Sequence, residues 1–176
     1  MRRVAIVGAG LTKFYRNVQE TPKELAYEAV KMALDSCDMK LSDIDCVVHG
    51  TAPDAFDGVH MKGEYLSDGS GAYRKLYMRH FVGGGTGVLS PIHGWFHVAS
   101  GMFDTCLVVT EEKMSCAYPH PAGAFLTIFD HTTEQPLYPT LIWIFAIEMN
   151  RFMTTYGYKK EDIALVAVKN KKNAID

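Results

Sequence analysis

Residues 81–110 read FVGGGTGVLSPIHGWFHVASGMFDTCLVVT. Three consecutive glycines at 83–85 permit a tight turn, which predicts that an apolar strand passes there into a helix. Apolar residues at roughly helical spacing predict that this helix continues through Val88 to Ala99 and ends at Ser100-Gly101. The β-branched run at 105–110 predicts a buried strand. Strands and helices in alternation are typical of the α/β class.

The first fifty residues predict a second unit of the same kind. The apolar run from Arg3 to Val7 predicts a strand that ends in a turn at Gly8–Gly10. Thr21-Pro22 is a helix start, and apolar residues recur three and four apart as far as Cys37. Ile44–His49 predicts another buried strand. A strand-helix-strand unit is parallel and right-handed, so we expect a mainly parallel central sheet covered by helices.

The remaining segments are less regular. Residues 51–80 and 111–138 have no clean periodicity, so we expect two long excursions, the first with one short helical piece. Residues 139–156 predict a helix closed by Gly157. Residues 160–171 predict another helix, with a strand around 165–168 as the alternative. No linker is evident, so residues 1–176 are expected to form one domain.

Composition excludes several classes of protein. The formal net charge is −2 and no block of five like charges occurs, so no nucleic-acid partner is expected. The apolar runs are too short for a membrane span. The four cysteines are widely separated in sequence and form no C-x-x-C pair, which indicates no metal site and no disulfide framework. Reduced thiols in a cytoplasmic protein fit this pattern best.

Several motifs carry candidate chemistry. Gly8-Ala9-Gly10 lacks the third glycine of a dinucleotide fingerprint, because Lys13 occupies its place. The turn at Gly84, Gly85 and Thr86 leaves backbone N–H groups at a helix start that can hold a thioester or enolate oxygen, although packing alone also explains such a turn. His93 and His97 lie four apart but lack an accompanying carboxylate, which favours core or interface histidines. Glu111 at a strand end can act as an acid or base, although such termini are more commonly solvated.

Three motifs in order resemble one family over the whole chain. The opening Arg2–Phe14 is similar to the first strand and turn of the thiolase superfamily, in its lipid-transfer and acetyl-CoA acetyltransferase-like branch. The stretch from Ala99-Ser100-Gly101 to Met114-Ser115 resembles the "ASG…VGVEKMS" motif of that branch. Residues 152–174 resemble its "YM..YG…VAVKNH.NA" segment, with Lys171 where His is common. The resemblance implies a thiolase-like N-terminal half with a βαβαβ-type sheet.

The resemblance also implies where the chemistry lies. In thiolases the nucleophilic Cys precedes the Gly of "ASG" by seventeen residues, and counting back from Gly101 gives Gly84, which has no side chain to acylate. Thiolase-like steroid side-chain aldolases also have Gly at this place, and a His in the place of His93. The catalytic His and second Cys of thiolases belong to a C-terminal half that is expected beyond residue 176, in a second subunit or lost by truncation.

We therefore expect half of a thiolase-superfamily protein that acts on acyl-CoA thioesters, with a coenzyme A thioester as substrate. Backbone donors at Gly84, Gly85 and Thr86 and the side chain of His93 are its candidate site. A retro-aldolase acting on a β-hydroxyacyl-CoA and a non-catalytic scaffold beside a zinc-ribbon and OB-fold protein are the alternatives. A thiolase using Cys116 is less favoured. The expected assembly is a dimer or hetero-oligomer.

Overall fold

The computed structural model describes residues 2–118 and 120–175. The chain divides into two compact units, Met1–Ala124 and Phe125–Asp176, and each is described by itself. Whether residues 1–176 act as one domain stays a prediction. Among the described residues, no helix is long and apolar enough to cross a membrane.

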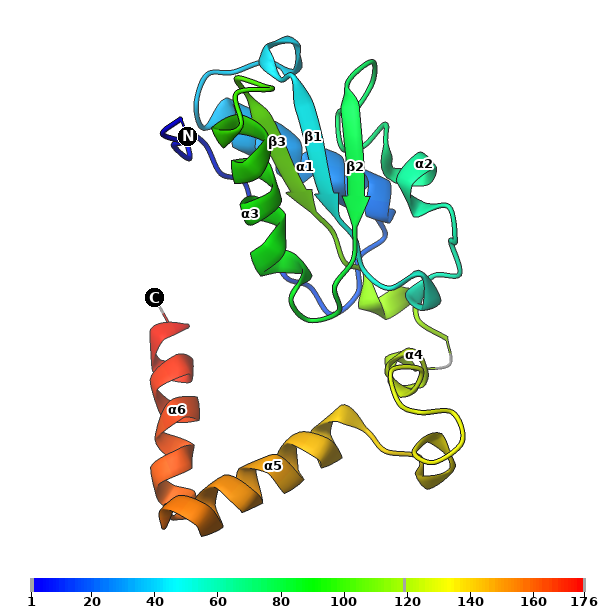
Figure 1. Cartoon of the computed structure of the whole chain (residues 1–176), viewed down its shortest axis with the longest axis vertical. Coiled ribbons are helices and arrows are strands. Elements are labelled where there is room, and N and C mark those ends of the chain that lie inside the picture. The colour runs from blue at the N-terminus through cyan, green and yellow to red at the C-terminus, as the bar shows by residue number, and fades with distance from the viewer. Residues whose placement is uncertain (1, 119, 176) are drawn as a thin grey trace. The chain divides into compact units, whose positions relative to one another are not determined.

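The first unit is built on a three-stranded parallel sheet of order β2-β1-β3 (Figure 1). Its strands are β1 Cys46–Gly50, β2 Leu76–His80 and β3 Cys106–Thr110. The first residues of the three strands, Cys46, Leu76 and Cys106, pair with one another in register. This arrangement confirms the α/β class and the parallel sheet expected from the strand-helix-strand pattern.

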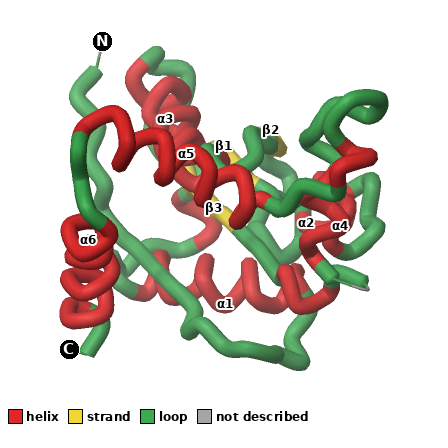
Figure 2. The backbone as a smooth tube through the Cα atoms, turned by 90° about the horizontal axis from the view of Figure 1, so that it is seen from below, coloured by secondary structure: helices red, strands yellow, loops and turns green. Residues whose placement is uncertain are grey.

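Two helices cover the two faces of this sheet, as Figures 1 and 2 show. Helix α1, Pro22–Asp35, begins with a capping box in which Thr21 and Glu24 satisfy each other's backbone N–H groups. Helix α3, Thr86–Ala99, packs against β1 and β3 from the other side. A Cβ added at Gly94 would lie 2.5 Å from Val108 Cγ2, so a glycine is needed where α3 crosses β3.

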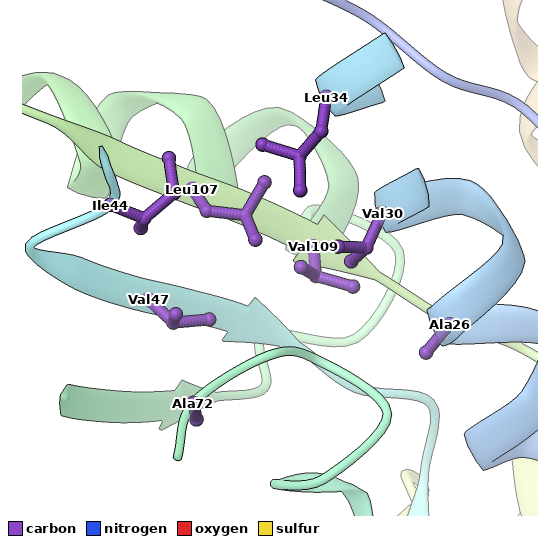
Figure 3. Close-up of a cluster of buried hydrophobic side chains, with 8 residues drawn as sticks. All are labelled: Ala26, Val30, Leu34, Ile44, Val47, Ala72, Leu107 and Val109. Atoms are coloured by element: carbon purple, nitrogen blue, oxygen red, sulfur yellow. The ribbon is translucent and has the colours of Figure 1, made fainter. Parts of the chain in front are cut away.

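The core lies between α1 and the sheet (Figure 3). Positions four residues apart on α1 point inward, which gives a continuous apolar stripe. The sheet contributes alternate residues of β1 and β3, because successive strand side chains point to opposite faces. The cluster consists of Ala26, Val30, Leu34, Ile44, Val47, Ala72, Leu107 and Val109.

Two predicted features of the first unit are wrong. The expected strand Arg3–Val7 is not a strand, and Ile6 is 89% exposed. This segment follows α1 and α3 rather than a neighbouring strand, since Arg2 N–H donates to Ala99 O and Ala9 N–H to Ser36 Oγ. Strand β2 lies inside the predicted excursion 51–80. Its partly exposed LYMRH sequence lacks the β-branched apolar run by which the other strands are recognised.

The excursions contain only short helices. Residues 51–80 include the 3-10 helix η2, Asp54–Phe56, and the short helix α2, Lys62–Leu66, which agrees with the expected helical piece. A further 3-10 helix, η1, spans Leu41–Asp43. Residues 111–138 include η3 Met114–Cys116, α4 Pro121–Leu126 and η4 Gln135–Leu137.

The second unit contains two longer helices. Helix α5, Leu141–Tyr156, begins at the N-cap Thr140 and ends at Gly157, whose φ of 74° is the left-handed conformation that closes helices. Helix α6, Lys160–Asn173, is helical throughout, so the alternative strand at 165–168 is wrong. Its basic last turn, with Lys171 and Lys172, suits the helix dipole.

Candidate functional site

The candidate site lies at the carboxyl edge of the sheet, where β1, β2 and β3 end in register at Gly50, His80 and Thr110. In open α/β sheets, ligands bind outside the carboxyl ends of the strands. A Cβ added at Gly50 would lie 2.3 Å from Ser90 Oγ and 2.9 Å from Thr86 Cγ2. Glycine at this position therefore allows the first turns of α3 to lie directly against the end of β1.

The glycine-rich turn before α3 is held by its own hydrogen bonds. Gly83 adopts a left-handed φ of 53°. The amide of Gly85 donates to Val82 O at 3.1 Å, and the amide of Thr86 donates to Gly83 O at 3.2 Å. Two of the three predicted donors thus have partners within the turn, and they bind a substrate oxygen only if those bonds rearrange. Their role as an oxyanion site stays a prediction.

Gly84 is an open position of this turn. A Cβ built there would meet nothing within 4 Å, and a positive φ is not required of the residue. Position 84, which the motif spacing predicts to correspond to the thiolase nucleophile, therefore has room for a side chain, and that correspondence stays a prediction.

A hydrogen bond between Ser90 and His80 fixes the tautomer of the His80 imidazole. Ser90 Oγ donates its single hydrogen to Thr86 O at 2.7 Å, so it accepts from His80 Nε2–H at 3.0 Å. This leaves His80 Nδ1 as an acceptor. Burial lowers the pKa of His80, and His93 lowers it further. The ring is consequently neutral near pH 7.

The predicted candidate His93 lies against His80, with ring centroids 4.5 Å apart. Within the described part of the chain, the Nδ1 atoms of both rings are buried and have no hydrogen-bond partner. His97 does not join them, because its ring packs on Phe103 at 5.7 Å. No group of three or more metal-ligating side chains occurs among the described residues. The structure thus places His93 against His80, the last residue of β2, and adds His80 as a candidate that the sequence did not indicate.

The opposite sheet face carries a buried ionic network at the same edge. The side chain of Lys62 is 1% exposed, and its Nζ lies 3.2 Å from Asp57 Oδ2 and 3.7 Å from Glu111 Oε1. It also donates to the carbonyl oxygens of Ala52 and Pro53 at 3.2 and 3.3 Å. Burial raises the pKa of Glu111, although Lys62 opposes this shift. Glu111 is thus buried rather than solvated, which the sequence did not indicate.

A second polar group lies next to this network. His49 Nδ1 and Tyr77 Oη are 3.0 Å apart. Burial lowers the pKa of His49 to about 3 and raises the pKa of Tyr77 to about 12, so both are neutral over the physiological range. Arg79 donates to Thr51 Oγ1 at 2.9 Å and is paired with Asp54. Tyr77 and Arg79 also line a shallow depression beside α2.

Comparison with known proteins gives partial matches. No protein-family model matches the chain. An acetyl-CoA acetyltransferase of Methanothermobacter thermautotrophicus is 28% identical over 178 residues, which cover 99% of this chain and 45% of that protein. A steroid side-chain-cleaving aldolase of Thermomonospora curvata is 28% identical over 97% of this chain and 44% of its own length.

One solved structure is similar to this chain in both fold and sequence. The Ltp2-ChsH2(DUF35) aldolase superposes with a TM-score of 0.65 and 26% identity, over 93% of this chain and 41% of that chain. In sequence and fold, the chain resembles thiolase-like proteins. The expected resemblance is confirmed, and the chain spans less than half the length of the relatives it matches.

Proposed function

We propose that this chain forms part of a thiolase-like protein that acts on acyl-CoA thioesters and makes or breaks the C–C bond beside the thioester carbonyl. The observation that carries the proposal is Gly84, which stands open at the start of α3 on the carboxyl edge of a parallel sheet. The names of the relatives, acetyl-CoA acetyltransferase and steroid side-chain-cleaving aldolase, support chemistry of this class.

In this proposal the site is shared with a second polypeptide segment. The relatives are more than twice as long as the matched region, and the Nδ1 atoms of His80 and His93 are buried without a hydrogen-bond partner among the described residues. A C-terminal thiolase half or a second subunit then supplies the acid and base, in a dimer or hetero-oligomer. A zinc-ribbon and OB-fold protein is a further proposed partner, and the cytoplasm is the proposed location.

Retro-aldol cleavage of a β-hydroxyacyl-CoA is the second candidate, and Gly84 favours it because this reaction needs no acyl-enzyme. A base takes the β-hydroxyl proton, and the hydroxyl carbon becomes a carbonyl as the Cα–Cβ bond breaks. The bond's electron pair passes to the α-carbon as an enolate, which oxyanion donors stabilise and a proton then quenches. The products are a ketone or aldehyde and a shortened acyl-CoA.

The decisive experiment uses the protein purified from its own source with any polypeptide that accompanies it. Native mass spectrometry identifies the assembly, and mass spectrometry of the acyl-CoA pool follows incubation with β-ketoacyl-CoA plus CoA, or with β-hydroxyacyl-CoA alone. Shortened acyl-CoA from the β-hydroxy substrate supports the aldolase. CoA-dependent thiolysis supports the acyltransferase.

The Gly84→Cys variant tests whether position 84 accepts a side chain that reagents can reach. We expect it to fold, because a side chain fits at this position, and to become alkylated by iodoacetamide at residue 84. Absence of turnover and of CoA binding in the native assembly would overturn both catalytic proposals and leave the scaffold alternative.

A further inference from the structure

Two cysteines that the sequence separates by sixty positions meet at the amino edge of the sheet. Cys46 opens β1, Cys106 opens β3, and the two residues are Cα partners in the parallel ladder. Paired residues of adjacent strands project their side chains to the same face. Here that face is covered by α3, because a Cβ at Gly94 would lie 3.5 Å from Cys106 Sγ. The pair lies at the opposite edge from the candidate site.

The two thiols interact directly. Each thiol also affects the pKa of the other, although less than burial does: Cys106 lowers the pKa of Cys46, and Cys46 raises that of Cys106. Their sulfurs also approach the carbonyl oxygens of Thr105 and Leu107 at 3.7 and 3.8 Å. Burial is the largest influence on both thiols and raises both pKa values, that of Cys106 to about 12. Both groups are therefore neutral thiols near pH 7.

The geometry disfavours a direct disulfide. Adjacent strands lie about 4.8 Å apart, and parallel Cβ vectors keep the two Cβ atoms at roughly that separation. A relaxed disulfide needs Cβ atoms about 3.5–4.5 Å apart. One atom inserted between the two sulfurs makes a longer bridge, which spans the larger Cβ–Cβ distance without moving the strands.

Because both thiols are protonated, a bridging group that reacts with neutral thiols is favoured over one that needs thiolates. A divalent metal ion must displace two protons from thiols whose pKa values are raised, which weakens its binding. A hydrated trivalent arsenical releases no protons, because each of its hydroxyl groups leaves as water with one thiol hydrogen.

We propose that Cys46 and Cys106 form a dithiol site for a single trivalent arsenical group. Two As–O bonds break and two As–S bonds form, two waters leave, and arsenic and sulfur keep their oxidation states. Cys106 is partly exposed, so its sulfur attacks the arsenic first, and the sulfur of Cys46, which is fully buried, closes the bridge after local opening of the sheet edge. This proposal does not depend on the proposed acyl-CoA function.

The test incubates the native protein with phenylarsine oxide at neutral pH and measures intact mass and peptide maps. We expect one arsenical per chain, bridging the peptides that contain Cys46 and Cys106. It should resist excess monothiol and leave with a small dithiol such as dimercaptopropanol. Because the peptide map is made on the wild-type protein, this result does not depend on a variant folding.

Variants sharpen the assignment. Cys46→Ala and Cys106→Ala should each bind the arsenical in a form that monothiol strips at least tenfold faster than from the wild type. The control variant C37S/C116S, which removes the other two thiols, should keep the resistant adduct. Adducts on Cys37 or Cys116 alone, no resistant adduct after prolonged incubation, or a 46–106 disulfide formed by a disulfide reagent in preference to the arsenical bridge would each overturn the proposal.

Discussion

Lys62 Nζ lies 3.2 Å from Asp57 Oδ2, and the lysine side chain is only 1% exposed. The same ammonium contacts Glu111 just beyond β3 and two carbonyl groups of the chain that leaves β1. One charge thus ties together the segments that leave two neighbouring strands at the carboxyl edge. The shape of that edge on the α2 side depends on this lysine.

Replacing Lys62 should destabilise the fold strongly. Lys62→Met leaves the buried carboxylate of Glu111 without its cation, and breaking a buried pair costs about 3–5 kcal/mol. Urea denaturation measures the loss. Lys23→Met is the matched control, because Lys23 forms an exposed pair with Asp68 at 3.3 Å, which is worth about 0–1 kcal/mol. Equal losses of unfolding free energy in the two variants would show that the Lys62 network stabilises the protein no more than an exposed ion pair does.

The stability of the protein should fall as the pH is lowered from about 6.5 towards 3. The pKa of His49 is about 3 in the folded protein, below its ordinary value, so the unfolded chain binds more protons in this window. Stability therefore rises with pH across it. His49→Gln should flatten the profile measured by urea denaturation at several pH values, whereas exposed His60→Gln should not. A profile unchanged by H49Q contradicts the burial of a neutral imidazole.

Replacing Gly50 by alanine should destabilise the protein, whereas replacing Gly84 by alanine should leave its stability nearly unchanged. Gly50→Ala forces its Cβ against Ser90 and Thr86, and such overpacking costs about 1–3 kcal/mol. Gly84→Ala meets open space and should change stability by no more than about 0.5 kcal/mol. Thermal unfolding of both variants measures the contrast. A large loss in G84A would mean that the turn cannot accept a side chain.

Removing His93 should raise the pKa of His80. Burial is the main cause of the lowered His80 pKa and the neighbouring His93 is the second, so His93→Gln removes one of the two influences that lower it, while the backbone at Thr86 continues to raise it. NMR titration of the histidine rings measures the shift. His97→Gln serves as the control, because His97 packs on Phe103 instead. If both variants leave the His80 titration unchanged, the two rings of the His80–His93 pair are not coupled.

The sequence predicted the helices whose ends are marked by capping residues. Thr21-Pro22 located the first residue of α1 because the cap and the proline act within one turn. Gly157 located the end of α5 for the same kind of reason. Arg3–Val7 has strand-like residues, but strand formation needs a neighbour, which this segment does not find in the described structure.

The features that depend on distant pairing were not predictable from one sequence. Lys62 is indistinguishable from a surface lysine until β3 places Glu111 beside it. Cys46 and Cys106 become neighbours only through the ladder register. The candidate position Gly84, by contrast, followed from the motif spacing, and the partner of His93 emerged only when β2 was recognised as a strand.

The central place of β1 has a consequence for synthesis of the chain. Both partners of β1 lie downstream, since residue 46 pairs with residues 76 and 106. A ribosome that has released the first fifty residues has made a strand with two unpaired edges, and pairings this distant in sequence form slowly. One edge of the nascent strand stays unpaired until Thr110 has left the exit tunnel, so this is the interval in which a chaperone would protect the chain.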